Sequence, residues 1–415
     1  MAGRRNAPKE GLEGKQKLQA VIIADSFDGA FRPLTLQLPR VLMPLAGIPM
    51  LEYNIHLLWR HGVEEIVIYC SSHADQIEVY LEKSQWTKKS DLKVTVLSAT
   101  DQLVRCEGDM LRDLDQSSTL HGDFILTWGD TIADFNLSAL LDAHSKAKAT
   151  EKDALLYTLA FSRASQTAGS LPSLPSSSQL AYTTDDNDEG GVIPGGGAQN
   201  HTDIIFLNDK HRVVEYVGAG RAHLNKKPPH VPLEFITQES LSCFGSCQFA
   251  HVAVVTQEGL VFMSDNFDFS SVVPDALRGC LMDDIAGKVS YAYMMPQASD
   301  PYGFSQRAST PMHYRSLEIA VRAGRIPLPL SLPPNEHAHC VVDAAVWAGT
   351  TLGPGCQVGK GAIIGSRCVI GAGAVIGEGC LIASGTHVPA NAVLKAGTRW
   401  CSTADYQKHE EQKNS

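Results

Sequence analysis

The sequence predicts an α/β fold, in which a doubly wound, mostly parallel sheet is followed by a left-handed parallel β-helix. Two observations lead to this prediction. Over the first two thirds of the chain, apolar runs of strand length alternate with amphipathic helical segments, which is typical of βα units joined by right-handed crossovers. From Val346 onwards, an aliphatic residue recurs at every sixth position, which is typical of hexapeptide repeats that coil into a β-helix.

The first of these regions opens with a strand, a long loop and a helix. An apolar run at 18–24 leads into a loop with Gly29, and apolar residues then recur along one helix face at Leu51, Ile55 and Leu58. In open sheets of this class, the loop after the first strand lies over the ligand crevice. The remaining expected elements are strands at 65–70, 93–97, 123–128 and 247–255, helices at 74–84 and 108–116, and a hairpin at 204–216.

The second region contains nine hexads, or three coils of three. A small residue follows each aliphatic residue by four positions, where a β-helix turns tightly. His387 is the only histidine in these hexads, and a lone histidine is a poor candidate for the catalytic base of a hexapeptide acyltransferase. The aliphatic positions are Val346, Leu352, Val358, Ile364, Ile370, Ile376, Ile382, Val388 and Leu394.

Composition sets limits on function. A chain of 415 residues predicts two or three domains, and its 44% hydrophobic and 19% charged residues are typical of globular proteins. A net charge of -10 argues against direct nucleic-acid binding. No apolar run is long enough to cross a membrane, and the ten cysteines form no CxxC pair, so we expect a cytosolic protein. The glycine-rich run at 190–197 does not join a strand to a helix, and we expect no cofactor.

These patterns also predict the limits of the domains. We expect a flexible tail at 1–17, a main domain at 18–318 that carries a disordered insertion at about 162–199, and a linker at 319–339. The β-helix should occupy 340–400, and a polar tail 401–415.

Residues 24–45, ADSFDGAFRPLTLQLPRVLMPL, resemble the nucleotidyltransferase signature of sugar-nucleotide pyrophosphorylases without a gap. Its prolines and leucines are retained, but its reactive positions are changed. The paired glycines are replaced by Asp25 and Ser26, and the third glycine by Asp28. Ala30 stands in place of the signature arginine and Arg40 in place of the signature lysine. The resemblance implies a Rossmann-type, nucleotidyltransferase-like domain with altered chemistry.

The altered positions predict the loss of nucleotidyl transfer. Glycines let backbone N–H groups approach a phosphate, whereas a carboxylate about 4 Å from one costs roughly 4 kcal/mol at an effective dielectric near 20. Losing a cation that stabilises a reacting phosphoryl group typically costs about 10³ to 10⁵ in rate. Two further positions of the family are Asp109, where the nucleobase is read, and Asp130, the metal aspartate. We therefore expect no catalytic residue, no metal, and a vestigial nucleotide-binding site at Asp25, Asp28, Ala30, Arg40, Asp109 and Asp130.

Four motifs in order are similar to the pyrophosphorylase-like epsilon subunits of eukaryotic translation initiation factor 2B. They are PRVL at 39–42, GDMLRD at 108–113, DNFD at 265–268, and Tyr302 and Gly303 followed by His313 and Tyr314.

This resemblance implies a subunit of a complex that accelerates GDP release from the GTP-binding initiation factor 2. Asn266 and Phe267 would contact that factor, and the other partners would be the sibling subunits, especially gamma. The residues alone leave a second interpretation open, in which Phe267 and Phe269 belong to the core. In the family, a helical-repeat domain with the exchange activity follows the β-helix, and this sequence ends at Ser415. We therefore expect little or no exchange by the chain alone.

Two other functions compete with this one. An active pyrophosphorylase, similar to mannose-1-phosphate guanylyltransferase, would use the crevice of the first domain. A hexapeptide acyltransferase would use the β-helix. The changes at Asp25, Asp28 and Ala30 count against the first, and the single hexad histidine counts against the second.

Overall fold

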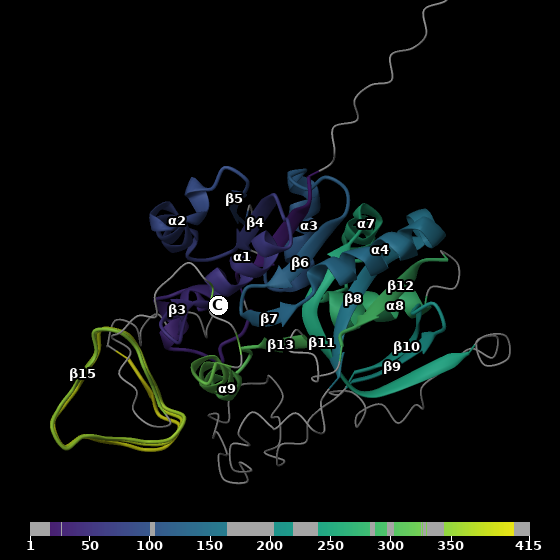
Figure 1. Ribbon diagram of the computed structural model, residues 1–415. Coiled ribbons are helices and arrows are strands. Elements are labelled where there is room, and N and C mark those ends of the chain that lie inside the picture. The colour runs from purple at the N-terminus through teal and green to yellow at the C-terminus, as the bar shows by residue number, and fades with distance from the viewer. Residues whose placement is uncertain are drawn as a thin grey trace, which may run out of the picture.

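The computed structural model describes residues 17–25, 27–99, 104–163, 203–218, 240–282, 287–296, 303–324 and 344–401, together with residues 326 and 329. They form a mixed α/β domain followed by a parallel β-helix of short strands (Figure 1). The expected tail at 1–16, the insertion from 164 to 199, most of the linker and the tail from 402 onwards lie outside these residues.

Within the residues that the structure describes, the main sheet has nine strands in the order β10-β9-β11-β6-β1-β4-β5, with β8 paired to β11 and β12 paired to β8. The ladders β6-β1, β1-β4, β4-β5 and β8-β12 are parallel, whereas all ladders of β11 and the β9-β10 hairpin are antiparallel. The sheet is therefore mixed and not mostly parallel, because β11 runs antiparallel to β6, β8 and β9, and β10 runs antiparallel to β9. The strands are β1 (Gln19–Ile23), β4 (Glu65–Cys70), β5 (Lys93–Ser98), β6 (Phe124–Trp128), β8 (Leu155–Arg163), β9 (Asp203–Asn208), β10 (Val213–Val217), β11 (Leu241–Val255) and β12 (Val289–Met294).

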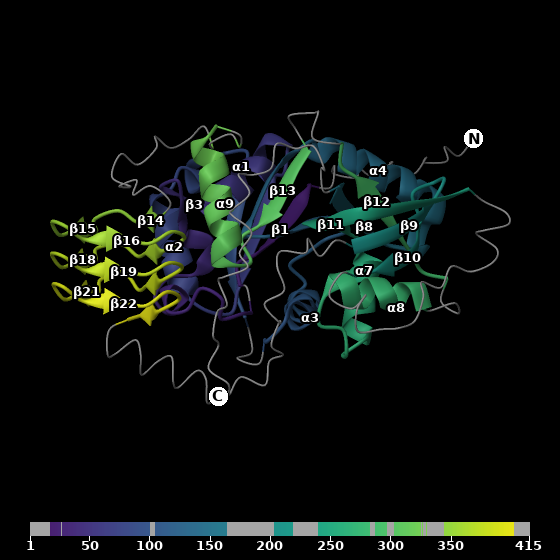
Figure 2. The same ribbon diagram turned by 90° about the horizontal axis from the view of Figure 1, so that it is seen from below.

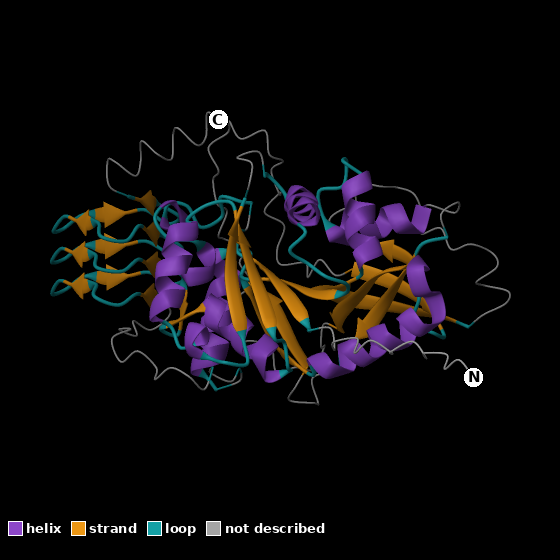
Figure 3. Cartoon of the chain, turned by 90° about the horizontal axis from the view of Figure 1, so that it is seen from above, coloured by secondary structure: helices purple, strands orange, loops and turns teal. Residues whose placement is uncertain are grey.

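Helices cover both faces of this sheet, which explains why β1 is apolar at every position after Gln19 (Figure 3). Val21 and Ile23 face a core shared with α3, α7 and α8, whereas Ala20 and Ile22 face a core shared with α1, α2 and α4. The helices are α1 (Met50–Arg60), α2 (Ala74–Lys83), α3 (Glu107–Ser117), α4 (Leu137–Glu151), α7 (Gln257–Asp265), α8 (Leu277–Met282) and α9 (Pro311–Arg322).

The expected elements are found within a few residues of their predicted limits, except that β11 begins at Leu241 and not at 247. Two expected domain boundaries also differ. Strand β8 continues to Arg163, so 162–163 belong to the sheet and not to the insertion. Helix α9 continues to Arg322, so 319–322 belong to a helix and not to the linker. In α9, Thr310 caps the first turn by accepting a hydrogen bond from the N–H of His313 at 3.2 Å, and Pro311 opens the helix.

The loop between β1 and α1 is not irregular throughout. It contains two short 3₁₀ turns, Leu34–Leu36 and Arg40–Leu42, and a small antiparallel pair, β2 (Pro44–Leu45) with β3 (Ile48–Pro49). A second two-stranded pair joins β7 (Thr131–Phe135) to β13 (Gly303–Arg307). These pieces lie between the main sheet and the β-helix.

The hexads stack into three coils, as the sixfold spacing predicts (Figure 2). Aliphatic residues point into the prism and form its own buried core. Small residues are required at the corners: a Cβ added to Gly371 would lie 2.4 Å from the backbone nitrogen of Ala390 in the next coil. The three parallel ladders are β14-β17-β20-β23 (Ala345–Val346, Ile363–Ile364, Leu381–Ile382, Arg399–Trp400), β15-β18-β21 (Thr351–Leu352, Val369–Ile370, His387–Val388) and β16-β19-β22 (Gln357–Val358, Val375–Ile376, Val393–Leu394).

One face of the prism packs against the first domain. The outward residues Ala345, Ile363 and Leu381 of the β14-β17-β20-β23 face are buried in a core shared with α9 and the β2-β3 pair. Trp347 donates a hydrogen bond from its indole nitrogen to the hydroxyl of Tyr314 at 3.2 Å, and that hydroxyl donates to the carbonyl of Pro44. Tyr314, part of the fourth motif, therefore helps to join the two domains.

Candidate functional site

The carboxyl ends of the parallel strands β1, β4 and β6 lie at one edge of the sheet, where ligand sites of α/β folds are found. The loop after β1 carries Asp25 and Asp28, and the turn after β6 carries Asp130. Arg40 reaches the same place from its 3₁₀ turn. The fold thus brings together three of the residues expected in the vestigial site, Asp28, Arg40 and Asp130.

These residues form a chain of ion pairs with a fourth residue, Arg307 at the end of β13. The guanidinium of Arg40 donates to Oδ1 of Asp28 through Nη2, and to Oδ2 of Asp130 through Nη1 at 3.1 Å. The Nε of Arg307 donates to the other oxygen of Asp130 at 2.7 Å. The side chains of Arg40 and Asp130 are only 2% and 4% exposed. We call these four residues the ionic network.

The ionic network contains two carboxylates and two guanidinium groups, so its formal charge is zero. Asp28, which we expected to face the phosphates of a nucleotide, is instead paired with Arg40. Both oxygens of Asp130 are occupied by guanidinium groups. A metal ion at Asp130 would have to compete with both guanidinium groups for this carboxylate.

The other expected residues of the vestigial site have different neighbours. Asp25 turns to the loop after β4, where it accepts hydrogen bonds from the N–H of Ser71 and from the hydroxyl of Ser72 at 3.2 Å, and burial raises its pKa. The N–H of Ala30 donates to Asp28 at 2.9 Å. Ser26 lies outside the described residues. Among the residues that the structure describes, no three His, Cys, Asp or Glu side chains gather as metal ligands would.

Sequence reasoning missed a second group at this edge. Glu107 accepts hydrogen bonds from the indole of Trp128 at 3.2 Å and from the N–H of Val272 at 2.8 Å, and burial raises its pKa to about 7. The ring of His251 lies 5.3 Å from that of Trp128, and burial, aided by the nearby charge of Arg307, lowers its pKa to about 3. These residues are far apart along the chain, so no local motif could have identified them.

The remaining predicted residues, Asn266 and Phe267, lie at the end of α7. The side-chain amide of Asn266 donates to the carbonyl of Phe262 at 2.8 Å and so closes the last helical turn. Phe267 is 80% exposed, whereas Phe269 packs on Phe262 with 5.7 Å between the ring centroids. The interpretation of both phenylalanines as core residues is therefore wrong for Phe267, which is presented to solvent.

Asp109 is linked through Arg112 to the end of α7 and is not part of the ionic network. It pairs with Arg112 at 2.8 Å and accepts a hydrogen bond from the N–H of Arg105 at 3.0 Å. Burial raises the pKa of Asp109, but these hydrogen bonds outweigh burial and lower the pKa below its usual value. The GDMLRD and DNFD motifs, more than 150 residues apart, thus meet through the hydrogen bonds of Arg112.

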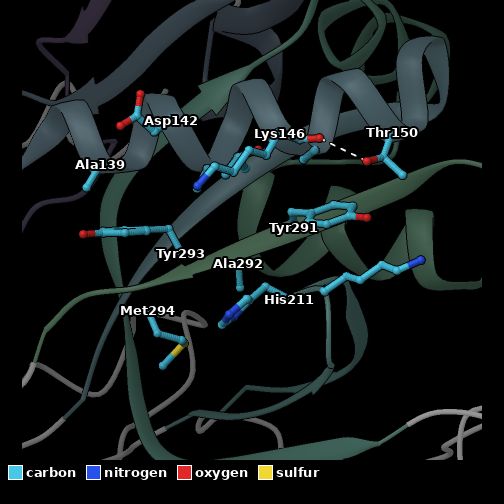
Figure 4. Close-up of a pocket in the computed structure, with 13 residues that line it drawn as sticks. Ala139, Asp142, Lys146, Thr150, His211, Tyr291, Ala292, Tyr293 and Met294 are labelled. Atoms are coloured by element: carbon cyan, nitrogen blue, oxygen red, sulfur yellow. Dashed lines mark hydrogen bonds between the residues drawn. The ribbon is translucent and has the colours of Figure 1, made fainter.

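A groove of about 560 Å³ lies elsewhere, between α4 and β12. Figure 4 shows Asp142 and Lys146 on the helix, and Tyr293 and His211 on the other side. None of the residues predicted from the sequence lines it. Among the described residues, no helix combines the length and the apolar character needed to cross a bilayer.

Two family models match this sequence. The model described as "Nucleotidyl transferase" matches residues 20–166, and "Bacterial transferase hexapeptide (six repeats)" matches residues 348–378. They correspond to the first part of the α/β domain and to the β-helix.

Relatives cover a larger part of the chain. Translation initiation factor eIF2B subunit epsilon of Dictyostelium discoideum is 29% identical over 286 residues, or 68% of this chain and 36% of that protein. The epsilon subunit of Schizosaccharomyces pombe is 29% identical over 296 residues, or 69% of this chain and 39% of that protein. A putative mannose-1-phosphate guanyltransferase of Sulfolobus acidocaldarius is 24% identical over 127 residues, or 31% of this chain and 34% of that protein. The chain thus aligns with little more than a third of the length of the two epsilon subunits.

Proposed function

We propose that this chain, which is similar to the epsilon subunits of eIF2B and carries a nucleotidyltransferase domain and hexapeptide repeats, works as a subunit of an eIF2B complex. In this proposal, it supports guanine-nucleotide exchange on the GTP-binding initiation factor 2 through assembly and direct contact. Its partners are the sibling subunits, gamma above all, and initiation factor 2 itself. It works in the cytosol, without a cofactor and without nucleotidyl transfer of its own.

The observation that carries the proposal is the exposure of Phe267. A phenylalanine ring that is 80% exposed at the end of a helix costs solvation free energy in the free chain, which burial against a partner would recover. Aromatic anchors of this kind supply much of the binding energy of protein interfaces. Asn266 contributes by holding the turn through its bond to Phe262.

The ionic network supports the absence of nucleotidyl transfer. Arg40 and Arg307 occupy both oxygens of Asp130, the position of the family's metal aspartate. A magnesium ion relies on such carboxylates together with substrate phosphates. This arrangement disfavours the alternative of an active mannose-1-phosphate guanylyltransferase.

The proposal is tested by the affinity of initiation factor 2 for the chain assembled with its sibling subunits. Phe267→Ala should weaken binding by about 30-fold or more, equivalent to roughly 2 kcal/mol. The matched control is Met282→Ala, because Met282 is equally exposed, at 84%, but lies at the end of α8. Unchanged affinity with Phe267→Ala, or an equal loss with both variants, would refute the contact. Release of pyrophosphate from GTP and mannose 1-phosphate by the purified chain would refute the loss of nucleotidyl transfer.

A further inference from the structure

We propose that Arg112 is a positioning residue that holds the segment 266–271 in the shape that presents Phe267 to its partner. This inference rests on the proposed function, since it concerns the same contact. In the pyrophosphorylase family, the turn at the place of the GDMLRD motif reads the nucleobase. In this chain, the motif instead supports the surface around Phe267.

Three backbone carbonyls converge on one guanidinium nitrogen of Arg112. Nη1 of Arg112 donates to the carbonyl of Met263 at 3.3 Å, to that of Asn266 at 3.1 Å and to that of Phe269 at 3.3 Å. The last carbonyls of a helix lack N–H partners within the helix, and cationic side chains stabilise this end through the helix dipole. Arg112 thus ends α7 and shapes the turn that follows.

Arg112 is itself fixed in place. Its side chain is 11% exposed, and Nη2 donates to Asp109 at 2.8 Å, three residues earlier on α3. The fork geometry of a guanidinium lets one group contact the carboxylate while another contacts the carbonyls. The ion pair with Asp109 also neutralises the charge of Arg112 beside the segment 266–271.

The backbone at the start of α3 closely approaches the backbone of the segment 266–271. The N–H of Gly108 donates to the carbonyl of Ser270 at 3.0 Å. A Cβ at Gly108 would lie 2.0 Å from the carbonyl oxygen of Phe269, so only glycine permits this contact. Glu107 accepts a hydrogen bond from the N–H of Val272 at 2.8 Å and fixes the far end of the segment.

Hydrogen bonds with α3 therefore hold both ends of the segment 266–271, with Phe269 packed inward and Phe267 facing solvent. The guanidinium carbon of Arg112 lies 5.9 Å from the centroid of the Phe267 ring, within reach of a weak cation–π contact. Because the ring is almost fully exposed, the hydrogen bonds to the backbone determine where it points. Preorganising an anchor in this way lowers the entropy lost on binding.

The test combines amide hydrogen exchange with a double-mutant cycle, on the chain assembled with its sibling subunits. Arg112→Met should speed exchange in peptides spanning 266–272 by about 10-fold or more, while exchange in β4 stays unchanged. It should weaken binding of initiation factor 2 by about 10-fold in the parent chain and by less than about 2-fold in the Phe267→Ala background. Arg112→Lys, which keeps the charge but lacks the fork, should give a smaller effect of the same kind. It also serves as the reserve variant if Arg112→Met does not fold.

The outcomes separate this inference from the proposed function. Unchanged exchange in 266–272 overturns the positioning role, whatever the binding data show. Equal losses of affinity in the two backgrounds also overturn it, because Arg112 would then act independently of Phe267. Faster exchange together with full binding by Phe267→Ala would uphold the positioning of the segment and refute the proposed contact with initiation factor 2.

Discussion

Replacing Arg40, which bridges two carboxylates, should destabilise the first domain far more than replacing Arg60, a more exposed arginine that pairs with Asp134. The Arg40 side chain is 2% exposed and bridges Asp28, which is 39% exposed, and Asp130, which is 4% exposed. In Arg40→Met, Asp28 can turn to water, while Asp130 retains only Arg307. Breaking a buried ion pair by removing one partner typically costs about 3 to 5 kcal/mol. Because Arg307 still compensates Asp130, we expect a loss at the lower end, about 3 kcal/mol.

Arg60→Met is the matched control, since Arg60 is 37% exposed and pairs with Asp134 at 2.6 Å in the same domain. Exposed pairs contribute about 0 to 1 kcal/mol. The assay is urea unfolding of the purified chain at pH 7, followed by tryptophan fluorescence at low and at high salt. Salt should weaken the contribution of Arg60 but not that of Arg40, which is shielded from water. Equal losses in the two variants, or a loss below about 1 kcal/mol for Arg40→Met, would refute the reasoning.

Three other predictions concern pH, the domain contact and the β-helix. Burial raises the pKa of Glu107 to about 7 from an ordinary 4.5, so its contribution to stability is complete below pH 4.5 and is lost as the pH rises through 7. Glu107→Gln should remove on the order of 3 kcal/mol of this pH dependence, measured by urea unfolding from pH 4.5 to 8. Trp347 lies in the shared core, so Trp347→Ala should lower the free energy of unfolding by about 3 to 5 kcal/mol and speed proteolysis between the domains. The control Val393→Ala, at a position 70% exposed, should change the free energy of unfolding by less than about 0.5 kcal/mol. Gly371→Ala should lower the melting temperature through its clash with Ala390, and an unchanged temperature would contradict the stacking.

Much of the fold could be predicted because its signals are local and periodic. The sixfold spacing of aliphatic residues predicted three stacked coils, since each hexad must bury its own aliphatic residue. The apolar run at 18–24 predicted a strand, which is observed as β1. The antiparallel strands around β11 were not predicted as such, because an apolar run does not reveal the direction of its neighbour.

The candidate sites show the limit of local reasoning more clearly. The sequence identified Asp28 and Arg40 as departures from a signature, and each departure was interpreted separately. Only the structure pairs them. Arg307, 177 residues from Asp130, had no signal of its own. Arg112 stood in a motif, but its bonds to Met263, Asn266 and Phe269 depend on the packing of α3 against α7.

The sequence by itself therefore determined the alternating strands and helices of the first half of the α/β domain, the coils of the β-helix, and the replacement of the pyrophosphorylase signature, because these depend on residue type and spacing alone. The tertiary structure decided that Asp28 and Asp130 are paired with Arg40 and Arg307, that Phe267 is exposed while Phe269 is packed, and that one face of the β-helix is buried against the first domain. The physical reason is that charge compensation and burial depend on side chains brought together from distant parts of the chain, and these distances are set only when the elements pack.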